Sequence, residues 1–314
     1  MKGKEMEKRI ISGTDLEVSV ICYGPMRIAQ SHDDPNLPVH LRAMHAAIDH
    51  GINFIHSSYE YGVRWMMHEV LKDHPERHNL LHVIKAPVPD WDDPDFDAGK
   101  LELIIDDALR ELCTDRIAMV QWMWRCRPHD EEHRLPLLAS IHDKVAETFE
   151  QLRQKGKVGH LACFPYFPES AATAMAHPAE KALIAYYNPL EMEMSPVIDT
   201  LNDDGRGFLA IRPLYEGVLT DRYASHADVP QGHRLAKEKY ADAFSARQKL
   251  AAAIPEAADG MTRFAIRFPL MSANCASVIV GLNSEEQVVE ICDHVEGVTP
   301  DPDTVSRVRA LMGH

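Results

Sequence analysis

Short apolar runs rich in β-branched and aromatic residues recur along the chain and alternate with longer segments of helical periodicity. Runs of four or five such residues are typical of strands that are buried on both faces of a sheet. Eight are present, at Val18–Cys22, Asn53–His56, His82–Lys85, Ile117–Gln121, His160–Cys163, Leu183–Tyr187, Phe208–Ile211 and Ser277–Val280. Helical segments long enough to cross over a sheet lie between them, for example His40–Asp49, Leu101–Leu112, Ile141–Gln154 and Glu285–Cys292.

This alternation predicts an α/β fold in which parallel strands close into a (β/α)8 TIM barrel. A length of 314 residues fits one such barrel, so a single domain over residues 1–314 is expected. The competing architecture, an open doubly wound sheet, carries a GxGxxG fingerprint after its first strand, and none follows Val18–Cys22. The polar stretch 215–243 predicts a long loop at the C-terminal face of the barrel, where loops carry the chemistry.

The charge and composition of the chain argue against nucleic acid and membranes as binding partners. The formal net charge of -15 disfavours nucleic acid, because nucleic-acid binding needs a basic surface. The first residues are charged and no apolar run is long enough to cross a membrane, so neither a signal peptide nor a membrane partner is expected. Six cysteines are scattered without a CxxC pair, which predicts reduced thiols in the cytoplasm. We expect a cytoplasmic monomer or small homo-oligomer that acts on a small-molecule substrate.

Two polar side chains at the ends of the second and third strands form the main catalytic hypothesis. Tyr61 follows the second strand, and Lys85 ends the third. A phenol with a pKa near 10 exchanges protons more readily near neutral pH when an ammonium stabilises its phenolate, so the pair predicts acid–base chemistry. The alternative from these residues alone is a loop tyrosine and a surface lysine without a catalytic role.

A longer motif around Tyr61 resembles the aldo-keto reductases. The chain reads Gly51-Ile-Asn-Phe-Ile-His-Ser-Ser-Tyr-Glu-Tyr-Gly62, and that family carries G-I-N-F-x-D-T-A-x-x-Y-G at the end of its second strand. The resemblance implies that Tyr61 is the general acid, that Lys85 is the lysine beside it, and that His56 replaces the family's aspartate. His56 either takes part in the chemistry or is a hydrogen-bonded histidine at the barrel rim. Without a neighbouring carboxylate, Lys85 is held less firmly in its protonated form and is available as a base.

The end of the fourth strand is the substrate region that the resemblance implies. The chain reads T-D-R-I-A-M-V-Q-W-M-W-R from Thr114, which is similar to the family's T-D-Y-I-D-L-x-Q-L-H followed by Trp or Arg. Met123 takes the place of the catalytic histidine, and a thioether cannot donate a hydrogen bond to a carbonyl. Trp124 and Arg125 are the candidate wall and anion clamp for a carboxylate- or sugar-like substrate. Alternatively, the tryptophans pack against the long loop and the arginines pair with the acidic residues 130–132.

Three further segments resemble the parts of that family that hold a nicotinamide cofactor. Ser277–Glu290 is similar to S-V-I-x-G-A-R-x-x-E-Q-x-x-E-N, the turn and helix at the adenosine, and Ala210–Thr220 resembles the pyrophosphate segment A-x-x-P-L-x-x-G-x-L-T. Gly24-Pro-Met-Arg is close to the G-T-M-R beside the nicotinamide. The implied cofactor-binding residues are Gly24, Met26, Pro213, Leu214, Gly217, Leu219, Gly281, Asn283, Gln287 and Glu290. The resemblance slightly favours NADP over NAD as cofactor, although Asn283 replaces the usual arginine.

The family's contacts to the nicotinamide carboxamide are replaced in this chain. Phe164 and Pro165 stand in place of its Ser-Asn, and Ile184 stands in place of its Gln. A buried amide left without partners costs on the order of 1–3 kcal/mol, so these changes predict weaker or displaced nicotinamide binding.

No metal is expected. The segment His129-Asp-Glu-Glu-His133 is similar to the zincin H-E-x-x-H, but its glutamates do not directly follow the first histidine, and the stretch is predicted as a polar loop ending near Pro136.

Three functions remain open from the sequence. The resemblance implies NAD(P)H-dependent reduction of a carbonyl, or the reverse oxidation, on a small polar or sugar-like substrate, with Tyr61 as acid and base. The altered reaction centre allows a cofactor-independent lyase, isomerase or hydrolase that uses Lys85, Tyr61 and His56. A catalytically silent, ligand-binding barrel is the third alternative.

Overall fold

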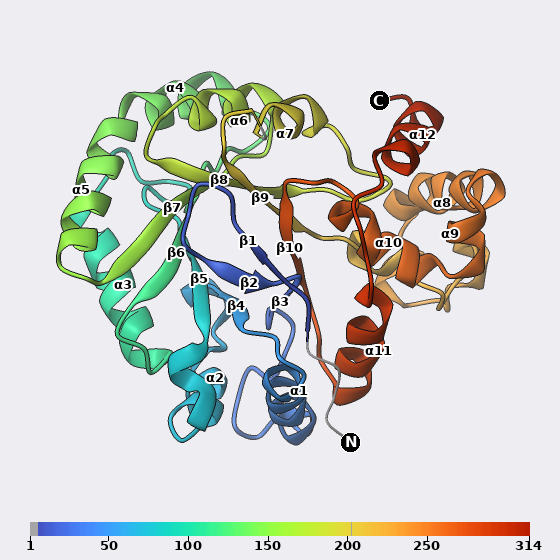
Figure 1. Cartoon of the computed structure of the whole chain (residues 1–314), viewed down its shortest axis with the longest axis horizontal. Helices are drawn as coiled ribbons and strands as arrows, with labels where there is room; N and C mark the ends of the chain where they lie inside the picture. Colours follow the sequence, from blue (N-terminus) through green and yellow to red (C-terminus); the bar gives the residue numbers. More distant parts are fainter. Residues whose placement is uncertain (1–5, 202) are drawn as a thin grey trace.

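The computed structural model describes residues 6–201 and 203–314, and a closed barrel of parallel strands forms its centre (Figure 1). Within these residues the eight barrel strands follow the order β10-β3-β4-β5-β6-β7-β8-β9. Their bounds are β3 (Ile21–Tyr23), β4 (Phe54–Ser57), β5 (Leu81–Ala86), β6 (Ile117–Met123), β7 (Val158–Phe164), β8 (Glu180–Tyr186), β9 (Gly207–Ile211) and β10 (Cys275–Val280). The predicted parallel barrel is confirmed.

Apolar side chains fill both faces of the barrel strands. Because successive side chains of a strand point to opposite faces, Met119 and Met123 of β6 join the cluster inside the barrel. Val120 and Trp122 of the same strand belong to the outer cluster, which lies between the strands and the helices. Every residue of β6 is buried, which explains why this strand reads as a continuous apolar run.

Helices surround the barrel (Figure 1). Their bounds are α1 (Leu37–Asp49), α2 (Arg64–Leu71), α3 (Ala98–Glu111), α4 (Glu131–Ser140), α5 (His142–Gln154), α6 (Pro168–Met175), α7 (Ser195–Leu201), α8 (Ala241–Ala253), α9 (Pro255–Asp259), α10 (Met261–Leu270), α11 (Glu285–Val295) and α12 (Pro302–Met312). The four helical segments expected from periodicity correspond to α1, α3, α5 and α11. Among the described residues no helix is both long and apolar enough to cross a membrane.

The polar stretch that ends near Pro136 is a helix, so the loop expected there is wrong. Helix α4 begins at Glu131, has Glu131 and Glu132 in its first turn and contains Pro136. Acidic residues in a first turn stabilise a helix through its dipole, and that signal outweighs the proline. Across the described part of the chain, no group of three or more His, Cys, Asp or Glu side chains is arranged to hold a metal ion. All six cysteines are free thiols, in keeping with their scattered spacing.

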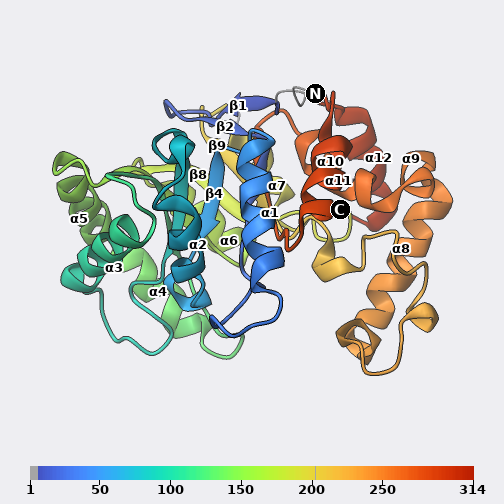
Figure 2. The ribbon, with the colours of Figure 1, turned by 90° about the horizontal axis from the view of Figure 1, so that it is seen from below.

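The first predicted strand is two strands. The run Val18–Cys22 is divided between β2 (Glu17–Ser19), which pairs antiparallel with β1 (Lys8–Ile10), and the barrel strand β3. The hairpin β1–β2 lies across one end of the barrel, away from the long loops that follow the barrel strands (Figure 2). Ile11 and Val18 are fully buried and belong to the interior cluster. The hairpin therefore closes the N-terminal end of the barrel and leaves the C-terminal end for the site.

The predicted long loop 215–243 follows β9 and has a compact structure of its own. It contains the 3-10 turns η3 (Tyr215–Gly217), η4 (His226–Asp228), η5 (Arg234–Ala236) and η6 (Glu238–Tyr240), and α8 begins at its end. Val218, Leu235 and Phe244 form a small apolar cluster beneath it. Asp221 anchors the loop by accepting hydrogen bonds from the amides of Met261 and Thr262, at 2.8 and 3.1 Å.

Candidate active site at the C-terminal end of the barrel

Tyr61 and Lys85 meet at the C-terminal ends of neighbouring strands. After β4 the chain forms a 3-10 turn, η1 (Tyr59–Tyr61), which is capped by the side chain of Ser58. Gly62 ends the turn with a left-handed φ of 62°, a conformation that favours glycine. Lys85 lies near the end of β5, and its Nζ is 5.1 Å from the centre of the Tyr61 ring. The structure brings together the two residues expected to be catalytic.

The Lys85 amine has aromatic rather than acidic neighbours. Its Nζ lies 5.1 Å from the Tyr61 ring centre and 5.7 Å from that of Phe164. None of the carboxylates in the described residues forms an ion pair with it. Burial and, to a smaller extent, the Arg125 guanidinium lower the pKa of Lys85 to about 8, against the opposing effect of the Glu60 carboxylate. At pH 7 roughly a tenth of this amine is therefore uncharged.

The pKa of Tyr61 shifts in the direction opposite to that expected from the sequence. Burial raises it well above its ordinary value, and the neighbouring Glu60 carboxylate raises it further. The Lys85 amine lies over the ring, and no hydrogen bond joins it to the Tyr61 hydroxyl. The expectation that Lys85 makes Tyr61 more acidic is wrong for this geometry. Tyr61 keeps its proton near neutral pH, whereas Lys85 titrates there.

His56 is a neutral, hydrogen-bonded residue inside the barrel. Its Nε2 lies 2.9 Å from Oε1 of Gln121, and because that oxygen only accepts, Nε2 is the donor. Burial lowers the pKa of His56 to about 3, and the charge of Lys85 contributes to this lowering. Of the two roles considered for His56, the structure favours the hydrogen-bonding one. The amide Nε2 of Gln121 is buried without a partner.

Aromatic rings enclose the site on the side of β7 and β8. The ring centre of Phe164 lies 5.1 Å from that of Tyr166 and 5.4 Å from that of Tyr186. Met123 is buried in the interior cluster with Phe164 and offers only its thioether to the site. This aromatic wall, formed by Phe164, Tyr166 and Tyr186, faces Lys85 through Phe164.

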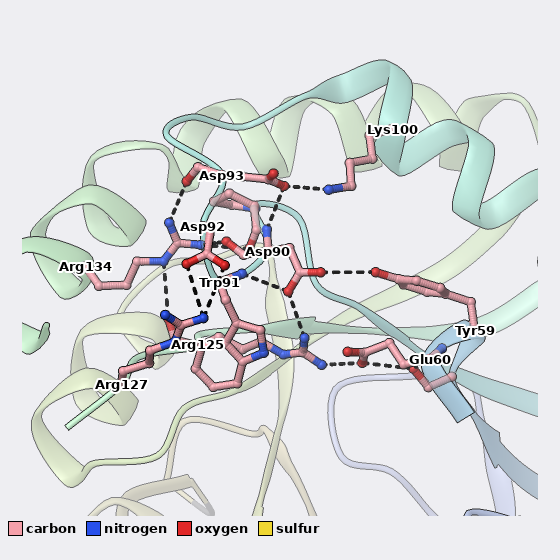
Figure 3. A network of polar contacts seen from close by, with 12 residues as sticks. Tyr59, Glu60, Asp90, Trp91, Asp92, Asp93, Lys100, Arg125, Arg127 and Arg134 are labelled. Atoms are coloured by element: carbon pink, nitrogen blue, oxygen red, sulfur yellow. Dashed lines mark hydrogen bonds and ion pairs between the residues drawn. The ribbon is translucent and has the colours of Figure 1, made fainter. Parts of the chain in front are cut away.

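Arg125 is bound by acidic residues, so the structure does not leave it as a free anion clamp. Its guanidinium bridges Glu60 of η1 and Asp90 of the loop after β5, the latter at 2.8 Å (Figure 3). It also lies 5.1 Å from the ring centre of Trp91. The pairing with residues 130–132 considered from the sequence is also wrong, because the acidic partners come from different strand ends.

The same network fixes the loop that follows β5. Arg134 of α4 donates to the carbonyl oxygens of Pro89 and Asp93, at 3.1 and 2.7 Å, and Lys100 of α3 forms an ion pair with Asp93 at 2.5 Å (Figure 3). Arg127 pairs with Asp92 at 3.1 Å. Residues of α3, of α4 and of the segment after β6 therefore hold this loop, and Asp90 in it accepts a hydrogen bond from Tyr59 of η1 at 3.3 Å.

Trp124 does not line the barrel mouth. Its ring is fully buried and packs against Trp122, at 5.2 Å between ring centres, and against His142 of α5, at 5.7 Å. The proposed substrate-binding role is wrong because Trp124 packs in the layer between the barrel and α5. The alternative contact with the long loop is not the one observed either.

Comparisons with known proteins identify the family. The model of the Aldo/keto reductase family matches residues 20–312. The chain belongs to the aldo/keto reductase family. An uncharacterized oxidoreductase, YrpG, of Bacillus subtilis is 26% identical over 76% of this chain and 78% of its own length. L-galactose dehydrogenase of Arabidopsis thaliana is 23% identical over 98% of this chain and 95% of its own.

Solved structures of aldo-keto reductases share the fold. The holo form of the aldo-keto reductase AKR11C1 from Bacillus halodurans superposes with a TM-score of 0.74 at 19% identity and covers 98% of this chain and 96% of that one. The glycerol dehydrogenase AKR11B4 from Gluconobacter oxydans gives a TM-score of 0.73 at 19% identity, with 98% and 95% covered. These likenesses concern the fold alone.

In this aldo/keto reductase the ends of β3 and β10 approach closely where the nicotinamide side was expected. The Gly24 amide donates to the Val280 carbonyl at 2.9 Å, and a Cβ on Gly24 would lie 3.1 Å from that oxygen. Gly281 follows, and a Cβ there would lie 3.6 Å from the Gly24 carbonyl. Met26 is exposed at the same end. The close approach explains the glycine at position 24.

The turn before α11 carries the residues aligned with adenosine binding. The Asn283 amide donates to the side-chain oxygen of Gln287 at 2.8 Å, and Ser284 caps the helix. Oδ1 of Asn283 is buried without a partner. Glu290 lies one turn further along, is exposed, and approaches His294 at 3.5 Å.

The segment aligned with the pyrophosphate site is strained and held by ion pairs. Arg212, Tyr215 and Glu216 have positive φ values of 62°, 43° and 57°, which cost energy for residues with a Cβ. Glu216 accepts from Tyr240 at 2.7 Å and pairs with Arg234 at 3.0 Å. Such strain in non-glycine residues clusters at functional sites and gave no signal in the sequence.

Four positions in this segment, Pro213, Leu214, Gly217 and Leu219, were implied as cofactor contacts. Leu219 is fully buried in the outer core, so its role is packing, and the cofactor contact expected for it is not supported. Pro213 is buried, and Leu214 packs against the same core. Gly217 ends η3 with a φ of 106°, a conformation that favours glycine.

Several site residues were not found from the sequence. Arg212 lies 4.8 Å from the ring centres of both Tyr186 and Tyr215 and pairs with Glu191 at 2.8 Å. Tyr186 ends β8, so its place at a strand end was a usable signal. The contact between Glu60 and Arg125 joins two strand ends distant in sequence, which no local pattern reports.

The residues fit one half of a nicotinamide nucleotide better than the other. A buried acceptor without a partner, Asn283 Oδ1, beside the N-terminus of α11 suits a ribose hydroxyl. At the positions aligned with the carboxamide contacts, Phe164 and Ile184 are buried hydrocarbon, and Pro165 has no N–H. The adenosine end therefore fits, and the three aligned carboxamide contacts are absent.

Proposed function

We propose that this aldo/keto reductase is an NAD(P)H-dependent oxidoreductase that reduces a carbonyl on a small polar or sugar-like substrate. The observation that carries the proposal is the meeting of Tyr61 and Lys85 at the barrel mouth, with Nζ 5.1 Å from the phenol ring centre. The relatives support the reaction class, because one is named an oxidoreductase and another L-galactose dehydrogenase. The nucleotide, when bound, supplies the hydride.

Proton transfer belongs to the chain's own residues. The Tyr61 hydroxyl, protonated near neutral pH, donates its proton to the substrate oxygen as charge develops there. The Lys85 ammonium, whose pKa is about 8, then supplies a proton that restores the Tyr61 hydroxyl. His56 keeps Gln121 in place and carries no charge. The aromatic wall limits water around these groups.

The aromatic side chains around the site support the proposed substrate class. The rings of Tyr166 and Trp91 stack at 6.5 Å between centres, nearly parallel at 18°. Trp91 supports Tyr166 from behind in this way, and the hydroxyls of Tyr166 and Tyr186 in the aromatic wall supply hydrogen-bond partners for a sugar or polyol. The nucleotide is NADP or NAD, with the family favouring NADP and Asn283 weakening that preference.

Nucleotide binding and turnover test the proposal separately. The purified protein is titrated with NADPH and with NADH while nucleotide fluorescence is followed, and then assayed with small hydroxy-aldehydes and, in reverse, with L-galactose. Tyr61→Phe should retain the nucleotide dissociation constant and lose turnover by roughly 10²–10⁴-fold. The matched control is Tyr59→Phe, which removes a hydroxyl from the same turn and should keep turnover within a few-fold. No binding of either nucleotide at millimolar concentration, or unchanged turnover in Tyr61→Phe, rejects the proposal.

A further inference from the structure

Lys85 combines three properties that a nucleophilic amine needs. It is partly buried against two rings, Tyr61 and Phe164, which remove water from around Nζ. It forms no hydrogen bond or ion pair with the rest of the described chain, so its lone pair is not committed. Tyr61, whose ring centre lies 5.1 Å from Nζ, carries a hydroxyl that serves as a proton donor.

The charged groups around Lys85 favour the neutral amine. The guanidinium of Arg125 is the neighbouring cation, and it is fixed there by Glu60 and Asp90. Glu60 is the acidic residue that opposes it, but its carboxylate is already paired with Arg125. His56, at the position of the family's aspartate, is neutral and so does not compensate an ammonium. A lysine that is desolvated and next to another cation is the environment in which lysines act as nucleophiles.

We propose that Lys85 condenses with small aldehydes and ketones at the barrel mouth to form an imine, an activity that needs no nucleotide. It goes beyond the proposed reductase function.

Imine formation requires only Lys85, Tyr61 and the carbonyl compound. The neutral Nζ adds to the carbonyl carbon, the C=O π bond becomes a C–O single bond, and one hydrogen of Nζ moves as a proton to that oxygen to give the carbinolamine. The Tyr61 hydroxyl then protonates the same oxygen, which leaves as water when the C=N bond forms, and the second hydrogen of Nζ passes as a proton to the Tyr61 oxygen. Nζ loses its two hydrogens in the overall reaction, R₂C=O plus amine giving imine plus water, and no oxidant or reductant is consumed. A protonated imine withdraws electrons from the neighbouring carbon and allows loss of its proton.

Trapping of the imine without nucleotide is the direct test. The full-length protein is incubated with hydroxyacetone and sodium cyanoborohydride, and the modified lysine is located by peptide mass spectrometry. We expect one dominant adduct, on Lys85, formed at least about tenfold faster at pH 7 than on the ion-paired surface residue Lys157. The labelling rate should rise from pH 6 to pH 8 as the amine loses its proton.

Two lysine variants test whether labelling reflects a nucleophilic Lys85 or the general reactivity of exposed lysines. Lys85→Arg keeps a cation in place and should abolish the dominant adduct, whereas Lys157→Arg should leave it unchanged. Exchange of the carbonyl oxygen of hydroxyacetone with ¹⁸O-water, a readout without a reducing agent, should be faster with the native protein than with Lys85→Arg. Adducts spread over surface lysines, or exchange unaltered in Lys85→Arg, overturn the proposal. The trapping assay contains no nucleotide, so a failure to trap the imine on Lys85 does not affect the reductase proposal. In the same way, a failure to bind NADPH or NADH does not affect the imine proposal.

Discussion

Glu180 and His142 form a buried pair whose titration lowers the free energy of unfolding between pH 6.5 and pH 8. Glu180 begins β8 and is fully buried, with Oε1 3.0 Å from Nε2 of His142 on α5. The His142 ring lies 4.7 Å from that of Trp122, centre to centre, in an aromatic layer. Burial raises the pKa of Glu180 to about 8 and lowers that of His142 to about 4. Near neutral pH the pair holds one proton, which Glu180 donates toward His142.

The pKa shifts of Glu180 and His142 determine whether the free energy of unfolding rises or falls with pH. In the unfolded chain Glu180 ionises near pH 4.5 and His142 near pH 6.5, the ordinary values for these groups. From pH 4.5 to 6.5 the folded and unfolded pairs bind equal numbers of protons, so this pair leaves the free energy of unfolding unchanged. From pH 6.5 to 8 the folded pair holds one more proton, and the free energy of unfolding falls by about 2 kcal/mol at about 1.4 kcal/mol per pH unit.

Glu180→Gln removes the carboxyl titration and keeps an N–H donor toward His142. The free energy of unfolding of the variant, relative to the unchanged protein, should therefore rise by about 1.4 kcal/mol per pH unit from pH 4.5 to pH 8. Urea unfolding, followed by the fluorescence of Trp122 and Trp124, measures this difference. The exposed control Glu147→Gln should run parallel to the unchanged protein. A difference that stays constant with pH means that Glu180 is ionised in the folded protein, and the reasoning fails.

Three further predictions concern the barrel mouth. Arg125→Lys removes the bridge between Glu60 and Asp90, so amide hydrogen exchange in the loop 87–97 should accelerate by about tenfold; an unchanged rate shows that Arg134 holds the loop without Arg125. Met123→His restores a hydrogen-bond donor and should raise kcat/KM for carbonyl reduction by roughly tenfold in steady-state kinetics, and a decrease contradicts the placing of substrate there. Asn283→Arg should shift the ratio of the NADH to NADPH dissociation constants toward NADPH by about tenfold in fluorescence titrations; a constant ratio excludes this turn as the 2′-phosphate position.

The fold was predictable because its signal is local and repeated. Each barrel strand is buried on both faces, so an apolar run marks it in the sequence, as in β6. The run Val18–Cys22 was predicted as one strand, but it contains the end of the β1–β2 hairpin and the start of the barrel strand β3. Both parts are buried, so the run reads as one apolar segment. Burial alone does not tell an antiparallel strand closing the barrel from a parallel strand within it. Helix α4 was not predicted because the stretch that ends near Pro136 is polar and was taken as a loop, although Glu131 and Glu132 form an acidic first turn.

The site was predictable only where a motif placed a residue at a strand end. Tyr61 and Lys85 were found in this way. Trp124 was assigned wrongly because adjacent residues of a strand end face opposite sides, and the motif did not say which side. The partners of Arg125 were missed because Glu60 and Asp90 come from two other strand ends. The direction of the Tyr61 pKa depends on how deeply the ring is buried, a quantity that no sequence pattern carries.

Two replacements in the reaction centre, His56 for the family's aspartate and Met123 for its histidine, both reduce the number of charged or titratable groups around Lys85. An aspartate in place of His56 would lie inside the barrel beside Lys85 and balance its ammonium, and the neutral His56 does not. An uncompensated buried cation is costly, so the amine lowers its pKa instead, and the site moves from a fixed ion pair to a titrating lysine. Met123 removes a second titratable group from the same interior cluster, so that Lys85 and Tyr61 are left to hold the proton. One arrangement then serves both proposals. A protonated Lys85 supports Tyr61 as an acid toward a carbonyl oxygen, and a neutral Lys85 attacks the carbonyl carbon.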